Sequence, residues 1–376
     1  MYWQREYLRE GVGMTLNETY RLELPDHGFL GSLLLRLSGG QASGYGQGEA
    51  DWRIIDRIPK IEVIGNGSTI IKSVTGYIAQ ALASWDQGII PPGVWKNYAT
   101  NTQWEYILIN FGRKLYDRDY GLDLSRFDDI ELRIQNDAGA AQFGDLAVAV
   151  VGFWKRDDPA GGFNGYMRSE DWRTWTVVRD ETQYLTLPTD NMIRRVILQA
   201  IPPVDSDFVE KTGMNNLMDD IKLALESGQK LVYQGGVDDL MRENYLHYGN
   251  EFIVAATPYM LADDGIDLSL GYVIGGAWGA GSQDGAVAGT NATFETGRTS
   301  FTQKPETYEA DSPANIMVKG MAPFLTAIFP FDWEADPATW LDPNRSKSVT
   351  MDVHSRDHAD VVGGVNKVSL DRLVNA

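Results

Sequence analysis

Cysteine is absent from this chain of 376 residues. Its absence excludes disulfide bonds, thiolate catalysis and zinc sites with cysteine ligands. Long hydrophobic runs are also missing, because the longest apolar stretch, Leu146–Trp154, is too short to cross a bilayer. The first residues carry too many charges for a signal peptide. We therefore expect a protein that is made and kept in a cytoplasm, or built into something assembled there.

Basic residues are the minority among the charges. The chain has 33 Lys and Arg against 52 Asp and Glu, which gives a formal net charge of −19. Such a field repels phosphate backbones, and no dense run of Lys or Arg offsets it. We therefore expect no direct nucleic-acid binding.

Histidine is scarce, with four in the chain. His354 and His358 have the i, i+4 spacing of two metal ligands on one helix face, but they lack the Glu that metalloproteases place after the first His. Two solvated polar residues are the preferred interpretation. Two-domain cupins are rejected as well, because their metal site needs a His-x-His pair that neither half contains. The sequence thus predicts no metal site built on histidine.

Carboxylates are abundant, but their pattern does not indicate catalysis. Adjacent Asp residues such as Asp128 and Asp129 point to opposite faces of a strand, so they are not catalytic pairs. Asp263, Asp264 and Asp267 could hold Ca²⁺, although their spacing fits no EF-hand. Asp123 and Asp267 are more typical of residues that cap a turn. No phosphate-binding loop and no G-x-S-x-G elbow is present. We therefore expect no enzyme, with no catalytic residue, no cofactor and no metal.

One eight-residue pattern occurs twice. Residues 18–25 and 181–188 both read E-T-x-x-L-x-L-P, and each is followed at the same distance by an apolar stretch. Alternation at Tyr20, Leu22 and Leu24 predicts a half-buried strand. Leu22 and Leu24, like Leu185 and Leu187, are expected to start two equivalent cores. The pattern therefore suggests a tandem repeat.

Four further landmarks follow in the same order in both halves. We align 61–71 with 222–232, 105–108 with 251–254, 121–125 with 265–269, and the strand that begins near Phe143 with 324–329. Unrelated coincidences would not stay collinear, so we interpret the chain as a duplication of one β domain.

Turn and strand signals give the fold class. Asn66-Gly67 supplies the positive φ of a tight hairpin, and 77–85 is predicted as a short helix. Each half has about eight short strands, many glycines and aromatic residues, and little helical periodicity. We predict an all-β chain of two tandem eight-stranded jelly-roll β-sandwiches, with short helices in loops.

The predicted domains follow from these signals. Residues 1–17 form an N-terminal arm with Tyr2, Trp3, Tyr7 and Leu8 on one helical face, which packs on its own domain or reaches a neighbour or a membrane surface. The first jelly roll covers 18–160, a linker 161–180, the second jelly roll 181–335, and a polar C-terminal tail 336–376. Val361–Val368 could add a strand to a neighbour's edge. The Gly-rich stretch Gly275–Thr302 is predicted to be a loop, in which Trp278 could anchor an interface.

Two tandem jelly rolls that each open with L-x-L-P, with a short helix after the second hairpin, resemble the double jelly-roll major capsid proteins. This lineage occurs in tailless icosahedral bacteriophages, archaeal viruses, adenoviruses and large eukaryotic DNA viruses, and the length suits a phage or other prokaryotic virus. The resemblance covers Glu18 to about Asp332. It implies a structural protein of the virion, assembled in the host cytoplasm, and no catalytic residues.

The resemblance also implies partners. Three chains would form a pseudo-hexameric homotrimer that tiles an icosahedral shell, beside neighbouring capsomers, penton proteins and minor capsid proteins. Gly275–Thr302 would be an exposed or trimer-locking loop. If a membrane lies under the shell, Tyr2, Trp3, Tyr7, Arg5 and Arg9 would lie closest to it. The competing class is a carbohydrate-binding or carbohydrate-cleaving double β-sandwich, which predicts a cleft with convergent carboxylates and exposed Trp.

Overall fold

A computed structural model describes most of the chain. The described residues are 1–42, 53–94, 102–140, 143–158, 161–203, 212–249, 252–256, 259–260, 266–269, 280–282, 290–294, 299–303, 312–313, 316–332, 334, 336–342, 345–346 and 348–375. Between 253 and 319 the description is limited to the backbone of the strands.

The described part of the first half contains one α-helix, α1 (Gly76–Gln87), and ten strands. The strands are β1 (Tyr2–Met14), β2 (Thr19–Glu23), β3 (Phe29–Gln41), β4 (Lys60–Gly65), β5 (Thr69–Val74), β6 (Gly93–Val94), β7 (Thr102–Asn110), β8 (Leu122–Asp123), β9 (Ile130–Gln135) and β10 (Phe143–Arg156).

The second half has two α-helices in its described part, α2 (Met214–Leu217) and α3 (Val237–Tyr248). Its main strands are β11 (Gly165–Thr176), β12 (Thr182–Thr186), β13 (Met192–Ile201), β14 (Asp220–Leu225), β15 (Lys230–Gly235), β24 (Thr326–Pro330), β25 (Val349–His354) and β26 (Val365–Asn375). Between α3 and β24 lie the short strands β16 (Phe252–Ala256), β17 (Tyr259–Met260), β18 (Ile266–Ser269), β19 (Ala280–Ser282), β20 (Thr290–Phe294), β21 (Thr299–Gln303), β22 (Ser312–Pro313) and β23 (Ile316–Gly320).

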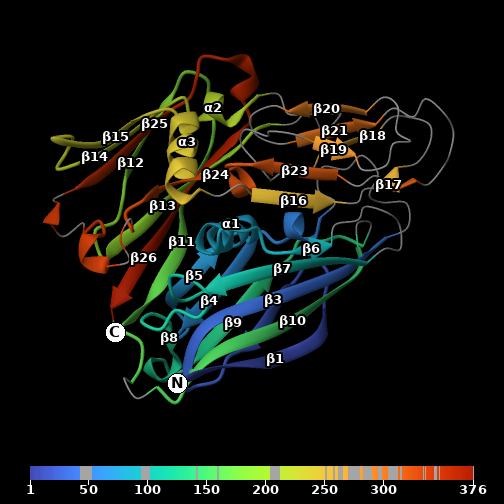
Figure 1. The fold of residues 1–376 in the computed structure, drawn as a ribbon, viewed down its shortest axis with the longest axis vertical. Helices are drawn as coiled ribbons and strands as arrows, with labels where there is room; N and C mark the ends of the chain where they lie inside the picture. The colour runs from blue at the N-terminus through green and yellow to red at the C-terminus, as the bar shows by residue number, and fades with distance from the viewer. Residues whose placement is uncertain are drawn as a thin grey trace.

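The chain folds into two sandwiches of four strands on four. In the first, the sheet β1-β10-β3-β7 faces the sheet β2-β9-β4-β5. In the second, β11-β26-β13-β24 faces β12-β25-β14-β15. Strands β5 and β11 pair in parallel, so one eight-stranded sheet runs through both halves. Figure 1 shows the first sandwich below, the second at the upper left, and α1 between them. The predicted double jelly roll is confirmed.

The two halves repeat each other strand by strand, including their irregularities. The pairings of β1, β10, β3 and β7 recur in β11, β26, β13 and β24. A bulge between Tyr7 and Arg9 on β1 recurs between Asp171 and Arg173 on β11. A second bulge skips Gly31 on β3 and Arg194 on β13. Because bulges are set by local pairing, their recurrence fixes which residues of the two halves are equivalent.

Both cores begin where the repeated pattern predicts. Leu22 and Leu24 are buried in the apolar cluster of the first sandwich, and Leu185 and Leu187 in that of the second. The predicted helix forms as α1, which begins after the capping side chain of Thr75 and ends at Gly88 in the left-handed region. At the first hairpin Asn66 and Gly67 adopt φ of 51° and 68°, as predicted.

Three segments predicted to be peripheral are strands. The helical arm over 1–17 is wrong, because Tyr2–Met14 is the strand β1 and pairs with β10. The linker over 161–180 contains β11, which joins the two sandwiches. The polar tail over 336–376 is also wrong, because β25 and β26 are inner strands of the second sandwich and β26 lies between β11 and β13.

Three of the aligned landmarks do not correspond. Strand β24 pairs with β13 as β7 pairs with β3, so 324–329 matches β7 and not the strand near Phe143. The match of β10 is β26. Strand β16, which contains 252–254, pairs with β23 and not with β13. Strand β18, at 266–269, pairs with β21, so it does not match 121–125 either. An inserted set of strands between α3 and β24 shifted the alignment, and within Gly275–Thr302 the backbone forms β19, β20 and part of β21.

Candidate functional site: the seam between the two sandwiches

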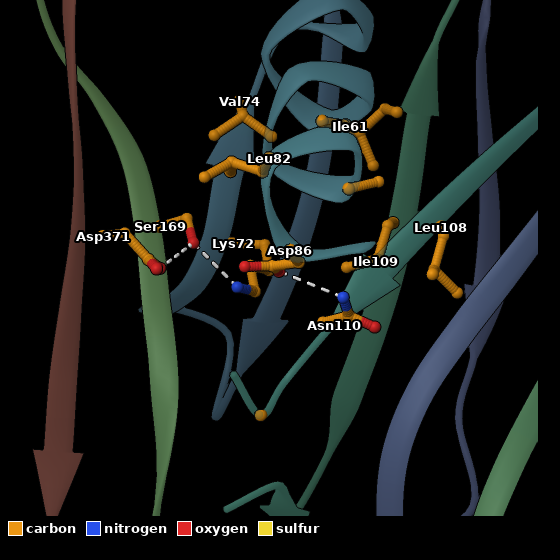
Figure 2. Close-up of a pocket in the computed structure, with 13 residues that line it drawn as sticks. Ile61, Lys72, Val74, Leu82, Asp86, Leu108, Ile109, Asn110, Ser169 and Asp371 are labelled. Atoms are coloured by element: carbon orange, nitrogen blue, oxygen red, sulfur yellow. Dashed lines mark hydrogen bonds between the residues drawn. The ribbon is translucent and has the colours of Figure 1, made fainter. Parts of the chain in front are cut away.

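The seam is the interface at which the first sandwich packs on the outer face of β11, β26, β13 and β24. The first sandwich contributes β5, the C-terminal end of α1 and the end of β7 (Figure 2). Ionisable side chains meet there from both halves although water is largely excluded. Charged groups are rarely buried unless they are paired, so the buried charges of the seam need an explanation.

Lys72 on β5 begins a hydrogen-bonded chain across the seam (Figure 2). Its Nζ donates to Ser169 Oγ at 2.7 Å, and that hydroxyl donates to Asp371 Oδ1, also at 2.7 Å. Ser169 lies on β11 directly opposite Lys72 in the parallel pair. The chain therefore ties the edge strand of the first sandwich to the two strands of the second that lie beside it.

Two adjacent arginines form the centre of the seam. Arg195 Nη1 lies 2.7 Å from Asp86 Oδ1 at the end of α1, and its Nη2 lies 3.1 Å from Asp332 Oδ2. Arg194 Nη1 lies 3.1 Å from the same Asp86 oxygen. Asn110 Nδ2 donates to the other oxygen of Asp86 at 3.0 Å. Asp86 from the first sandwich thus forms ion pairs with both arginines of the second.

Arg194 is held by three further groups. Its Nε donates to Asp332 Oδ2 at 2.7 Å, and its Nη1 lies 3.2 Å from Asp371 Oδ2. Its Nη2 donates to the backbone carbonyl of Arg113 in the first sandwich at 2.9 Å. Arg194 sits at the bulge of β13, which turns two consecutive arginines to the same side of the strand.

The seam is balanced in charge, with three cationic side chains (Lys72, Arg194, Arg195) and three carboxylates (Asp86, Asp332, Asp371). Burial alone would raise the pKa of Asp332, but the two guanidiniums overcome this and hold it below its usual range. Burial lowers the pKa of Lys72 to about 8, against the opposing effect of Asp371 and Asp86. The charges therefore compensate one another, as burial requires.

Apolar contacts surround the charged centre. Trp85 Nε1 donates to Thr326 Oγ1 at 3.1 Å, and its ring lies 5.2 Å from that of Phe252 and 5.6 Å from that of Tyr248. Ile197 and Ile328 of the second half belong to the core cluster of the first sandwich. The core of the first sandwich therefore extends into the second across an apolar interface, and apolar interfaces of this kind limit relative motion of domains.

The small pocket beside Lys72 has room for little more than a water molecule, about 20 Å³. Its lining includes Asn110, Asp86 and Ser169 (Figure 2). Such a volume excludes a sugar ring, so the carbohydrate-site alternative has no support from this pocket. The chemistry of the seam is structural pairing.

The residues singled out in the sequence lie elsewhere. His354 ends β25, and His358 caps a short 3-10 turn, so the two do not share a helix face. Among the described residues no cluster of three or more His, Asp or Glu could hold a metal ion. Asp123 caps a turn by accepting from the backbone N–H of Ser125, as predicted. Asp263, Asp264 and Trp278 lie outside the described residues, as does the side chain of Asp267.

Sequence reasoning missed every ionisable side chain of the seam. A signal was available, since Arg194 and Arg195 interrupt the apolar stretch Met192–Leu198, and Lys72 interrupts Ile70–Val74. A charge inside a buried strand needs a buried partner, but the sequence does not say which one.

No helix in the described part of the chain is long and apolar enough to cross a membrane.

Comparison with solved structures shows the fold across the whole chain. The major capsid protein of Sulfolobus turreted icosahedral virus matches with a TM-score of 0.60 at 11% identity, over 99% of this chain and 96% of that one. The major capsid protein P2 of bacteriophage PM2 matches at 0.53 and 8% identity, over 100% and 98%. The PBCV-1 virus capsid model matches at 0.55 and 10% identity, over 99% and 94%. No protein-family model and no curated protein sequence matches the chain.

Proposed function

We propose that this chain is a viral major capsid protein and that three copies form a pseudo-hexameric ring that tiles an icosahedral shell. The observation that carries the proposal is the pairing of two equivalent sandwiches through one shared sheet in one chain, in a fold shared over its full length with capsid proteins of three viruses. Two similar wedges per chain give six per trimer. A role without catalysis fits a seam whose arginines and carboxylates pair with one another and whose lysine is held by Ser169.

The seam gives this role its mechanical basis. A tile must hold its two wedges at one fixed angle, or the ring would not close. The buried ion pairs and the shared core oppose any hinge motion between the sandwiches, because separating them would leave charges unpaired in an apolar interface.

Other partners follow from the same proposal. Neighbouring capsomers, penton proteins and minor capsid proteins would contact the ring, assembly would take place in the host cytoplasm, and a membrane could lie under the shell. The inserted strands β16–β23, of which β19, β20 and part of β21 fall within Gly275–Thr302, lie to one side of the second sandwich at the upper right of Figure 1. We assign this insertion to the exposed or trimer-locking role.

The proposal is tested by expressing the chain and measuring its mass under native conditions. We expect trimers by native mass spectrometry and hexagonal tiles or closed shells by electron microscopy. A stable monomer that binds glycans and never forms rings, over a wide range of concentration and salt, would reject the capsid role in favour of the carbohydrate alternative.

A further inference from the structure

The two surfaces that meet in the seam each have an equivalent in the other sandwich, and these equivalent surfaces do not meet within the chain. Because the halves repeat strand by strand, each seam residue of the first sandwich has an equivalent in the second, and the reverse. Helices α1 and α3 are each followed by a glycine in the left-handed region, Gly88 and Gly249. Aligning these glycines makes Trp85 equivalent to Leu246 and Asp86 equivalent to His247. Strand β15 is equivalent to β5, the edge strand that meets β11. We call β15 and the exposed side of α3 the donor edge.

The first sandwich carries the matching surface. Ser169 lies opposite Asp371 on β26 just as Arg5 lies opposite Phe153 on β10, and Ile197 lies opposite Ile328 just as Leu34 lies opposite Leu108. We call the outer side of β1, β10, β3 and β7 the receptor face, made of Arg5, Tyr7, Leu34, Arg36, Tyr106, Leu108, Val151 and Phe153.

The equivalents of the receptor face are covered inside the chain. They are Ser169, Asp171, Ile197, Gln199, Thr326, Ile328, Ser369 and Asp371, of which seven are buried and Asp171 is half-buried. In the receptor face itself Arg5 and Tyr7 are exposed, and Leu34, Arg36 and Tyr106 are half-buried. Leu108, Val151 and Phe153 are already buried in the single chain. The first sandwich thus leaves open five of the eight positions, whereas the second sandwich buries seven of their equivalents.

The donor edge exposes apolar side chains at the matching positions. Leu246 is 81% exposed, although its equivalent Trp85 is 4% exposed against the second sandwich. Leu231 and Val232 on β15 are 55% and 43% exposed. An unpaired apolar edge strand invites pairing with another chain, so these residues need a cover in an assembled state.

The receptor face is basic, whereas the donor edge carries charges of both signs. The receptor face has Arg5 and Arg36, and the donor edge has Asp239 and Glu243 beside Arg242 on α3 and Lys230 on β15. In a chain with net charge −19, a surface with two arginines and no carboxylate among its members is unusual. The two arginines can pair with Asp239 and Glu243 when a donor edge meets a receptor face, whereas contact between two receptor faces would bring arginines together.

We infer that the donor edge of one copy docks on the receptor face of a second copy and reproduces the seam between chains. This inference rests on the proposed function and names the contact that closes the ring. In it, Leu246 meets Tyr106 of the next copy, as Trp85 meets Thr326, and β15 lies beside β1. The contact is heterologous, so it closes into a ring or continues as a filament. It also places Tyr7 and Arg5 between copies and not on a membrane.

The absence of native cysteine makes this contact testable by disulfide trapping. The variant Leu246→Cys with Tyr106→Cys places one thiol on each surface. Under oxidising conditions we expect covalent dimers and trimers on non-reducing gels, since each copy offers both partners. Either single variant is expected to stay a monomer on the gel. The matched control joins Leu246→Cys with Val362→Cys, a 59% exposed residue outside both surfaces, and should give no ladder.

Two results would overturn the inference. A dimer from Leu246→Cys alone would mean that two donor edges meet, and a double variant without crosslinks would mean that the surfaces do not touch. In either case wild-type trimers by native mass spectrometry would leave the proposed function intact, whereas a wild-type monomer would reject that function itself. As a second readout, Leu246→Asp is expected to abolish trimers without loss of folding, and Val362→Asp to keep them.

Discussion

Lys72 shows how the seam alters the chemistry of a single residue. Burial lowers its pKa from 10.5 to about 8, so between these pH values the unfolded chain keeps a proton that the folded chain has lost. The free energy of unfolding attributable to Lys72 therefore rises with pH from about 8 to about 10.5, and below pH 8 its burial opposes folding. We expect the wild type to gain stability relative to Lys72→Met between pH 8 and 10.

Urea unfolding of both proteins at pH 7, 8, 9 and 10 measures this difference. Lys230→Met is the control, because the Lys230 side chain is 64% exposed and lies outside the seam. A stability difference between wild type and Lys72→Met that stays constant over this range would contradict the lowered pKa.

Arg195 tests whether the seam depends on its ion pairs. Arg195→Met leaves Asp86 and Asp332 to share Arg194, with part of their charge uncompensated in a buried site. Removing one partner of a buried pair costs about 3–5 kcal/mol. We expect a loss of this size in denaturant unfolding. Arg21→Met, which removes an exposed pair with Glu131, should cost less than about 1 kcal/mol. Equal losses in the two variants would mean that the seam charges do not stabilise the fold.

At the scale of elements, the C-terminal strand β26 tests whether residues 336–376 are a dispensable tail or part of the core. Strand β26 lies between β11 and β13 and carries the buried residues Val368, Leu370 and Asp371. A chain that ends at Gly364 would lose the middle of the sheet that joins the sandwiches. We expect this truncation to be insoluble or to lack a cooperative thermal transition, while a chain that ends at Asn375 folds normally. Normal folding of the chain that ends at Gly364 would mean that β26 is dispensable, as the predicted tail implied.

The elements that the sequence predicted have a local signal, either a regular hydrophobic alternation or a cap. Strands β2 and β12 alternate regularly, and α1 has a cap at each end, so all three were predictable. Strand β26 escaped because Asn366, Lys367, Ser369, Asp371 and Arg372 are polar and yet buried. Several of these polar residues find partners far away in the sequence, on β11 and α2, which a pattern of hydrophobicity does not reveal.

Strand β1 was taken for a helix for a related reason. Tyr2, Trp3, Tyr7 and Leu8 recur at a spacing close to helical, and the bulge between Tyr7 and Arg9 breaks the alternation of the strand that follows. In the second hairpin, the turn between Leu225 and Lys230 is one residue longer than that between Gly65 and Thr69. Aligning the turn glycines therefore matches β5 with β15 but shifts β14 by one residue, which exchanges its faces.

At the scale of the whole molecule, the net charge of −19 sets the conditions for assembly. Copies repel one another over the Debye length, which is about 30 Å at 0.01 M salt and about 8 Å at 0.15 M. The complementary charges at the proposed contact are few, so the long-range repulsion of whole copies should dominate at low salt. We expect mostly monomers at 0.01 M NaCl and mostly trimers or larger species at 0.15 M.

Mass photometry of the purified chain across this range of salt measures the populations directly. The apolar contact of Leu246 does not weaken as salt rises, so the assembled fraction should reach a plateau above 0.15 M and not fall again. Leu246→Asp should remain monomeric at every concentration of salt, because it removes that apolar contact and adds a negative charge. A wild-type population of trimers that shrinks as salt is added would show that attraction between opposite charges, and not apolar contact, holds the copies together.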